Sequence, residues 1–168
     1  IAEKADVILA VGTRLQDFTT GSWTAFAHDA KIIGLNAARH DAAKHLSTPV
    51  VGDARLGLIA LMADLVGHQA PESWTASAKQ ERATWDDYVA ENTRVGNGPA
   101  SYAQAIGEVN RLCDPRDRVV AAAGGLPAEV MANWKTLDIG TVDVEFGFSC
   151  MGYEIPAGIG VRWADPAF

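Results

Sequence analysis

The sequence has few cysteines, no cluster of basic residues and no long apolar run. Its two cysteines, Cys113 and Cys150, lie far apart without CxxC spacing, so neither a zinc site nor a disulfide framework is indicated. The formal net charge is −7. Because affinity for a phosphate backbone depends on clustered Lys and Arg, this charge argues against nucleic-acid binding. We therefore expect a reducing compartment and no nucleic-acid partner.

Long apolar segments and targeting signals are also missing. The longest apolar stretches, such as Val7–Val11 and Val119–Val130, are well short of the roughly 20 residues that span a bilayer. We therefore expect no membrane partner and a cytoplasmic location. The first residues have neither the basic region nor the apolar region of a signal peptide, and no initiator Met is present. We expect the first residue to lie inside a longer protein.

The histidines lack the spacings that hold a metal ion. The four are His28, His40, His45 and His68. None of them forms an HxxxH or HExxH pattern, so positions on the surface or in loops are favoured over ligation. We predict no metal site within this chain.

What is present indicates a globular α/β protein. Apolar residues make up 48% and charged residues 21% of the chain, which is an ordinary globular balance. Short apolar runs at Asp6–Val11, Lys31–Ala37 and Thr48–Ala54 are separated by loops, and the third leads into a helical pattern that ends at Gly67. This order predicts an α/β fold built of Rossmann-like units with parallel sheets.

The middle of the chain is polar and ends in a glycine-rich stretch. Residues 71–98 read as an exposed helix followed by a linker, because the segment is bounded by Pro71 at its start and by the Gly96-Asn97-Gly98-Pro99 run at its end. The sequence therefore predicts one domain segment at 1–70, a helical linker at 71–98 and a second segment at 99–168.

The second segment begins with a helix that Ser101 can cap. Its apolar positions, expected to form one buried face, are Tyr102, Ala105, Ile106, Val109 and Leu112. A buried strand is predicted at Arg118–Ala123. The residues Gly124-Gly125-Leu126-Pro127 then open a further helix through Trp134, with Pro127 suited to a first helical turn.

This strand, glycine pair and helix start form a candidate phosphate site. In an open parallel sheet, ligands gather at the carboxyl ends of strands, and the free N–H groups of a helix start favour anions. A tight turn in which Gly124 and Gly125 only relieve steric crowding is an equal alternative at this point.

A second glycine-rich stretch, EFGFSCMGYEIPAGIGV, covers Glu145–Val161. The lack of side chains at Gly147 and Gly152 allows a flat ligand to approach the main chain, and Met151 offers a polarizable apolar surface. Taken alone, a glycine-rich helix packed on a sheet explains the same pattern equally well.

Together the two stretches carry a family resemblance. The order VVAAAGGLPAEVMANW and then VEFGFSCMGYEIPAGIGVRWADP resembles the start of the pyrophosphate-binding domain in thiamine diphosphate enzymes of the acetolactate synthase and pyruvate oxidase group. Within that group, FSCMGYE and AGGLPAE are most similar to the trihydroxycyclohexane-dione hydrolases of myo-inositol catabolism. The segments ADVILAVGTRLQDFTTGSWTAF, LNAARHDAAKH and VVGDARLGL resemble the second half of that family's central, Rossmann-like domain.

The resemblance implies cofactor contacts for eight residues: Gly124, Gly125, Leu126, Pro127, Ser149, Cys150, Met151 and Gly152. The first four stand where such enzymes hold the diphosphate by main-chain donors and a helix start. Ser149 matches the position whose carbonyl accepts from the exocyclic amine of the aminopyrimidine. Met151 matches the residue that supports the bent cofactor and offers its N–H to the pyrimidine ring.

The resemblance also implies a reaction and what else it requires. The expected cofactors are thiamine diphosphate and Mg²⁺, and the expected substrate is a small cyclic dione whose ring is opened to a deoxy-glucuronic acid. The Mg²⁺ ligands of the family lie beyond Phe168, and its catalytic glutamate belongs to an N-terminal domain, so no catalytic residue is assigned here. We expect an inactive fragment of a homodimer or homotetramer.

Several residues leave alternatives open. Glu145 and Glu154 flank the cofactor segment and either reach substrate or stabilise a helix start. Thr13 and Arg14 are the candidates if the first segment binds a nucleotide, although we expect no flavin. The remaining alternatives for the whole chain are an acetolactate synthase-like carboligase or lyase and, in another class, a non-catalytic nucleotide-binding or regulatory α/β domain.

Overall fold

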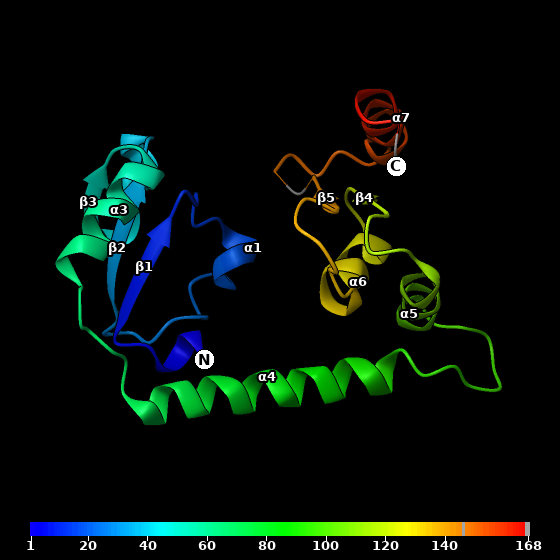
Figure 1. Cartoon of the computed structure of the whole chain (residues 1–168), viewed down its shortest axis with the longest axis horizontal. Coiled ribbons are helices and arrows are strands. Elements are labelled where there is room, and N and C mark those ends of the chain that lie inside the picture. The colour runs from blue at the N-terminus through cyan, green and yellow to red at the C-terminus, as the bar shows by residue number, and fades with distance from the viewer. Residues whose placement is uncertain (146, 167–168) are drawn as a thin grey trace. The chain divides into compact units, whose positions relative to one another are not determined.

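The computed structural model describes residues 1–145 and 147–166. The chain forms two compact units, Ile1–Glu81 and Arg82–Phe168, which divide within one helix (Figure 1). Each unit contains a parallel sheet and helices. The predicted α/β class with parallel sheets is confirmed.

The first unit is built on a parallel sheet of three strands in the order β1-β2-β3 (Figure 1). Its elements are η1 (Ala2–Lys4), β1 (Val7–Val11), α1 (Asp17–Thr20), β2 (Lys31–Asn36), α2 (Arg39–Ala42), η2 (Lys44–Leu46), β3 (Thr48–Val51) and α3 (Ala54–Asp64). The three strands predicted for this segment are confirmed, with ends that differ by a few residues. Because all three are parallel, their carboxyl ends meet at one edge of the sheet.

Two glycines let helices approach the central strand β2. A Cβ atom on Gly34 would lie 2.3 Å from the backbone oxygen of Ala42 in α2. A Cβ atom on Gly57 in α3 would lie 2.8 Å from the side chain of Leu35. Leu35 and Ala42 are both buried, so the core of the first unit lies on β2.

Helix α3 carries an apolar stripe that the described part of the chain does not bury. Asp53 caps the helix, with its carboxylate accepting from the Leu56 N–H at 2.9 Å. Leu56 and Met62 are 67% and 72% exposed, and no residue of α3 is buried within the described structure. The helix ends at Asp64, before Gly67, whose φ is +83°.

Helix α4 (Glu72–Asn92) is the long polar helix predicted for the middle of the chain. Val89 is its buried residue. In the first unit, the Lys4 ammonium donates to the Glu81 carboxylate of α4 at 2.8 Å. The two compact units divide inside α4, and the boundaries near residues 70 and 98 stay a prediction.

The second unit contains a parallel pair of short strands with three helices. Its elements after α4 are α5 (Tyr102–Leu112), β4 (Val119–Ala121), α6 (Gly125–Asn133), β5 (Val142–Val144) and α7 (Glu154–Ala164). Ile106, Ala121 and Val130 form its buried apolar cluster, from α5, β4 and α6. The predicted strand and both predicted helix starts are present, whereas β5 was not predicted.

Helix α5 has the predicted cap but not the predicted face. The Ser101 hydroxyl accepts from the Gln104 N–H, and the Gln104 side chain accepts from the Ser101 N–H, which is a capping box. Of the five positions expected to form the buried face, only Ile106 is buried. The prediction was wrong because the helix turns its small residues Ala103 and Gly107 inward, where a Cβ on Gly107 would lie 2.4 Å from the Thr93 Cβ.

None of the helices in residues 1–145 and 147–166 combines the length and the apolar character needed to cross a bilayer.

Candidate functional site

The turn after β4 places a glycine in a conformation that other residues avoid. Gly124 is the N-cap of α6, with φ +121° and ψ −174°, and the next three residues form the first helical turn. This combination of angles is essentially restricted to glycine. The first N–H groups of a helix have no partner inside it, so this turn presents free donors and the positive end of the helix dipole.

A cavity of about 410 Å³ lies at this turn. It is lined by Val119, Val120, Ala121, Ala122, Ala123, Gly124, Gly125, Leu126, Pro127, Val130 and Glu154. All four residues predicted to hold a diphosphate therefore share one cavity. Glu154, from the start of α7, is the one acidic side chain in the lining.

The second predicted segment leaves the same edge of the small sheet. Strands β4 and β5, labelled in Figure 1, pair in parallel, with Ala121 opposite Val144. The Glu145 N–H extends the ladder to the Ala121 oxygen at 3.0 Å. Both glycine-rich loops follow the carboxyl ends of these neighbouring strands. This is the edge at which open parallel sheets bind ligands.

Glu145 organises the loop that follows β5. One of its carboxylate oxygens accepts from the Phe148 N–H and the other from the Cys150 N–H, each at 2.8 Å. These backbone donors, with Cys150 the largest contributor, lower the pKa of the Glu145 carboxyl below its ordinary value. Glu145 therefore favours the ionised state and bridges residues three and five positions away.

The residues predicted to contact a pyrimidine ring are exposed in this loop. Ser149 has φ +59° and Gly152 has φ +94°, while the Met151 side chain is 80% exposed. The Met151 N–H donates to the Ser149 oxygen at 3.1 Å. Ser149, Cys150, Met151 and Gly152 do not line the cavity at the β4 turn.

Helix α7 links this loop to the cavity. The Gly152 N–H donates to the Glu154 carboxylate at 3.1 Å, and Glu154 lines the cavity. Nearby, the Tyr153 hydroxyl donates to Asp143 of β5 at 3.4 Å, and the Asp143 charge raises the pKa of Tyr153. From the sequence, Glu145 and Glu154 are predicted only as acids that flank the cofactor segment. No sequence pattern indicates that Glu145 accepts hydrogen bonds from the loop backbone.

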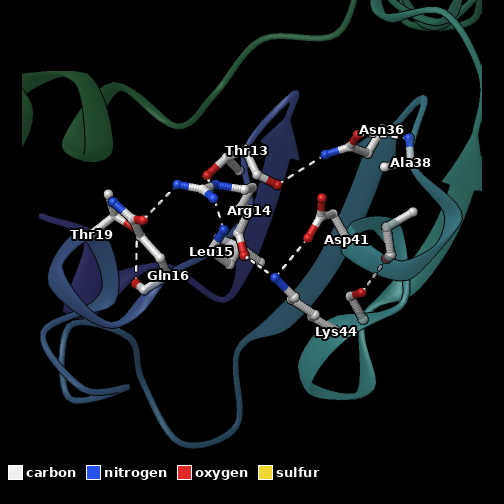
Figure 2. A network of polar contacts seen from close by, with 11 residues as sticks. Thr13, Arg14, Leu15, Gln16, Thr19, Asn36, Ala38, Asp41 and Lys44 are labelled. Carbon is white, nitrogen blue, oxygen red and sulfur yellow. Dashed lines mark hydrogen bonds and ion pairs between the residues drawn. The ribbon is translucent and has the colours of Figure 1, made fainter. Parts of the chain in front are cut away.

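The loop after β1 contains the candidates Thr13 and Arg14. Side chains from the end of β2 and from η2 donate hydrogen bonds to its backbone (Figure 2). The Asn36 amide donates to the Thr13 oxygen at 3.0 Å, and the Lys44 ammonium donates to the Arg14 oxygen at 2.9 Å. Lys44 also pairs with Asp41 at 2.6 Å and lowers the pKa of that carboxyl. The Arg14 guanidinium donates to the side chain of Gln16 at 3.0 Å.

A second, slightly larger cavity of about 460 Å³ lies in the second unit, away from the predicted residues. Trp85, Trp134 and the buried Asn133 are among its lining residues. The Asn133 amide nitrogen donates to the Glu129 backbone and side-chain oxygens, which fixes the orientation of the amide. None of the eight predicted cofactor residues lines this cavity.

The remaining polar candidates show no metal cluster. The His45 and Trp23 rings contact each other at a tilt of 35°, with ring centroids 3.3 Å apart. Cys113 and Cys150 are free thiols, and burial together with Asp117 raises the pKa of Cys113. Within residues 1–145 and 147–166, no group of three or more His, Cys, Asp or Glu side chains is placed to hold an ion.

Comparison with known protein families gives one match in the first unit. Residues 1–61 match the family described as thiamine pyrophosphate enzyme, central domain. This match contains the sheet of the first unit and most of α3.

Similarity to individual proteins covers nearly the whole chain. The 3D-(3,5/4)-trihydroxycyclohexane-1,2-dione hydrolase of Geobacillus thermodenitrificans is 33% identical, over 99% of this chain and 29% of that protein. The protein of the same name from Lacticaseibacillus casei is 34% identical, and that from Clostridium botulinum is 29% identical. Each of these two alignments covers 99% of this chain and 30% of the relative. The chain therefore spans less than a third of the length of these relatives.

Proposed function

We propose that this chain, whose residues 1–61 match the central domain of thiamine pyrophosphate enzymes, is part of a hydrolase that opens the ring of 3D-(3,5/4)-trihydroxycyclohexane-1,2-dione to 5-deoxy-glucuronate. The proposal is supported by similarity that runs through both units to proteins named for this substrate. In this proposal, residues 1–70 complete a central domain, 71–98 link it, and 99–168 begin the domain that binds the cofactor.

The observation that carries the proposal is the shared edge of β4 and β5. The parallel pairing of Ala121 with Val144 sends both glycine-rich loops out at the same edge. A cofactor with a diphosphate at one end and a planar ring at the other needs two such backbone surfaces close together. If Gly124 and Met151 served unrelated functions, there would be no functional reason for both loops to leave the sheet at the same edge.

The turn at Gly124 fits a diphosphate. Its main-chain donors and helix start are suited to an anion, and no side chain at Gly124 limits the approach of phosphate oxygens. The carboxylate of Glu154 in the same cavity would repel that anion, so binding would depend on the main-chain donors and on a Mg²⁺ ion bound with the cofactor to offset the repulsion. We propose that the ligands of this Mg²⁺ lie in other parts of the protein.

The loop after β5 fits the aminopyrimidine. We assign the Ser149 oxygen as acceptor for the exocyclic amine and the Met151 N–H as donor to the ring, with Cys150 and Gly152 completing the surface. Because the Ser149 oxygen and the Met151 N–H bond to each other at 3.1 Å, a bound ring replaces this hydrogen bond. The exposed Met151 side chain supplies the apolar support for the bent cofactor.

Thiamine diphosphate supplies the carbanion chemistry when it is bound. In this proposal the eight predicted residues orient the cofactor, and the catalytic glutamate comes from another domain, in a homodimer or homotetramer. On this basis the isolated 168 residues are expected to show neither ring opening nor micromolar affinity for thiamine diphosphate.

The test compares alanine substitutions at the neighbouring Gly124 and Gly125, each made in the full-length protein that contains these 168 residues. A Cβ at Gly125 meets only the Tyr102 ring at 3.6 Å, whereas one at Gly124 forces an L residue to φ +121°. We expect Gly124→Ala to weaken thiamine diphosphate binding, measured by calorimetry with Mg²⁺, by roughly tenfold or more, and Gly125→Ala to change it little.

Three other results would redirect the proposal. Binding of ADP instead of thiamine diphosphate would favour the nucleotide-binding alternative. Binding of thiamine diphosphate with acetolactate formation from pyruvate, and without ring opening of the dione, would favour the carboligase. Unchanged affinity in both the Gly124→Ala and the Gly125→Ala variant would remove the diphosphate from this turn.

A further inference from the structure

Glu145 directly follows β5, and both of its carboxylate oxygens are engaged by the loop beyond it. The Phe148 and Cys150 N–H groups each donate to it at 2.8 Å. Hydrogen bonds to an ionised acceptor are roughly twice as strong as those between neutral groups. Glu145 is therefore committed to its own backbone, and this commitment determines the shape of residues 147–150.

The bond to Cys150 fixes the direction of a neighbouring atom. In a trans peptide, the carbonyl oxygen and the following N–H point in opposite directions, and the described chain has no cis peptide bond. Because the Cys150 N–H points toward Glu145, the carbonyl oxygen of Ser149 points away from it. The φ of +59° at Ser149 is a conformation that L residues seldom adopt, and the two bonds from its neighbours hold it.

We propose that Glu145 is a positioning residue that orients the Ser149 carbonyl toward the 4′-amino group of the cofactor's pyrimidine ring. This inference rests on the proposed function and adds to it the residue that sets the pyrimidine contact. Glu145 itself contacts neither cofactor nor substrate. It acts through the rigid peptide plane between Ser149 and Cys150.

The test uses an analogue of thiamine diphosphate that lacks the 4′-amino group. In the wild-type full polypeptide, the ratio of the two dissociation constants measures the contact to the Ser149 oxygen. We expect wild type to prefer thiamine diphosphate by roughly tenfold, which is the scale of one well-placed hydrogen bond. Glu145→Gln keeps the size of the side chain but offers one acceptor oxygen, so its preference is expected to fall to about twofold or less.

Glu108→Gln is the matched control. Glu108 is, like Glu145, a half-buried acid with a lowered pKa, but its partner is Arg111 on α5 and not the loop. We expect this variant to keep the wild-type preference. Glu145→Asp keeps the charge on a side chain that is one carbon shorter and cannot reach both N–H groups, so we expect an intermediate preference. This variant provides the measurement if Glu145→Gln does not fold.

The outcomes separate the two proposals. A wild-type protein that does not bind thiamine diphosphate overturns the proposed function and this inference with it. A wild-type preference that Glu145→Gln and Glu145→Asp retain in full overturns only the role of Glu145. A wild-type protein that binds the cofactor and the analogue equally also overturns it, since no contact to the 4′-amino group would then exist.

Discussion

Gly124 and Ser149 both have positive φ angles and meet that requirement in different ways. Gly124 has no Cβ, so a φ of +121° carries little steric cost. Ser149 has a side chain, and its φ of +59° costs on the order of 1–3 kcal/mol. The Glu145 carboxylate offsets this cost by bonding the residues on either side. The shape of this loop is thus fixed by hydrogen bonds within the loop itself.

The ionisation of Glu145 is predicted to govern this loop. Its pKa in the folded chain is lowered, so the loop hydrogen bonds are present above the ordinary value of 4.5 and are lost as the pH falls through the lower folded value. In an NMR titration, the amide signals of Phe148 and Cys150 should move together with a midpoint below 4.5. Glu145→Gln should abolish the step, and a midpoint at or above 4.5 would contradict the prediction.

At this scale the sequence was informative where a residue type is nearly obligatory. Gly124 indicated a tight turn that few other residues suit, and Pro127 is favourable in the first turn of the helix that follows. Glu145 was recognised only as an acid near the loop, since its role depends on N–H groups that turn back toward it. Backbone N–H groups occur at every residue except proline, so a carboxylate that accepts from them cannot be recognised by the spacing of particular residue types.

Close approach of α2 to β2 depends on one missing methyl group. An added Cβ at Gly34 would lie 2.3 Å from the Ala42 backbone oxygen, and neither group can move away easily. We expect Gly34→Ala to lower the free energy of unfolding of the first unit by about 1–3 kcal/mol in urea titration. Gly52→Ala is the control because a Cβ there meets nothing within 4 Å. Equal effects would refute this packing argument.

The capping box of α5 makes a separate contribution. Ser101→Ala removes the acceptor for the Gln104 N–H and should destabilise the second unit by about 1 kcal/mol. Ser101→Asp keeps an acceptor at the N-cap and should lie close to wild type in the same thermal unfolding measurement. If both substitutions cost the same, the cap is not what stabilises the helix start.

Elements were predictable where the pattern matched the local physics. The strands of the first unit are apolar runs ended by glycine or polar residues, and they were found. The face of α5 was assigned from its largest apolar residues, but the close contact at Gly107 selects the side with the smallest ones. Strand β5 is three residues long and contains a charged residue, so it is too short to show the apolar run or the alternation that predicts a strand.

The whole chain behaves as two compact units with separate cores. The core of the first unit lies on β2, and that of the second is the cluster around Ile106. Because each unit has its own core, we expect each to unfold cooperatively by itself, and scanning calorimetry should resolve two transitions. Gly34→Ala should shift only one of them and Ser101→Ala only the other. A single transition, or a shift of both by either substitution, would show that the units unfold as one.

The meeting of the two glycine-rich loops belongs to this larger scale. Each loop was visible in the sequence, but their proximity depends on the parallel pairing of β4 with β5. A crossover of strand, helix and strand usually gives this arrangement. The sequence did not reveal β5, so the shared edge followed only from the structure.

The parallel arrangement of every strand pair in the described residues also affects how the chain reaches its native state. The first partners in the three ladders are Val7 with Lys31, Ile33 with Thr48, and Val119 with Val142. Each pair closes a loop of more than a dozen residues, and that entropy is lost before any ladder bond compensates for it. Hairpins are therefore unable to nucleate either sheet. Nascent helical turns are the local structure available first, and the chain is expected to collapse around them on a millisecond scale or slower.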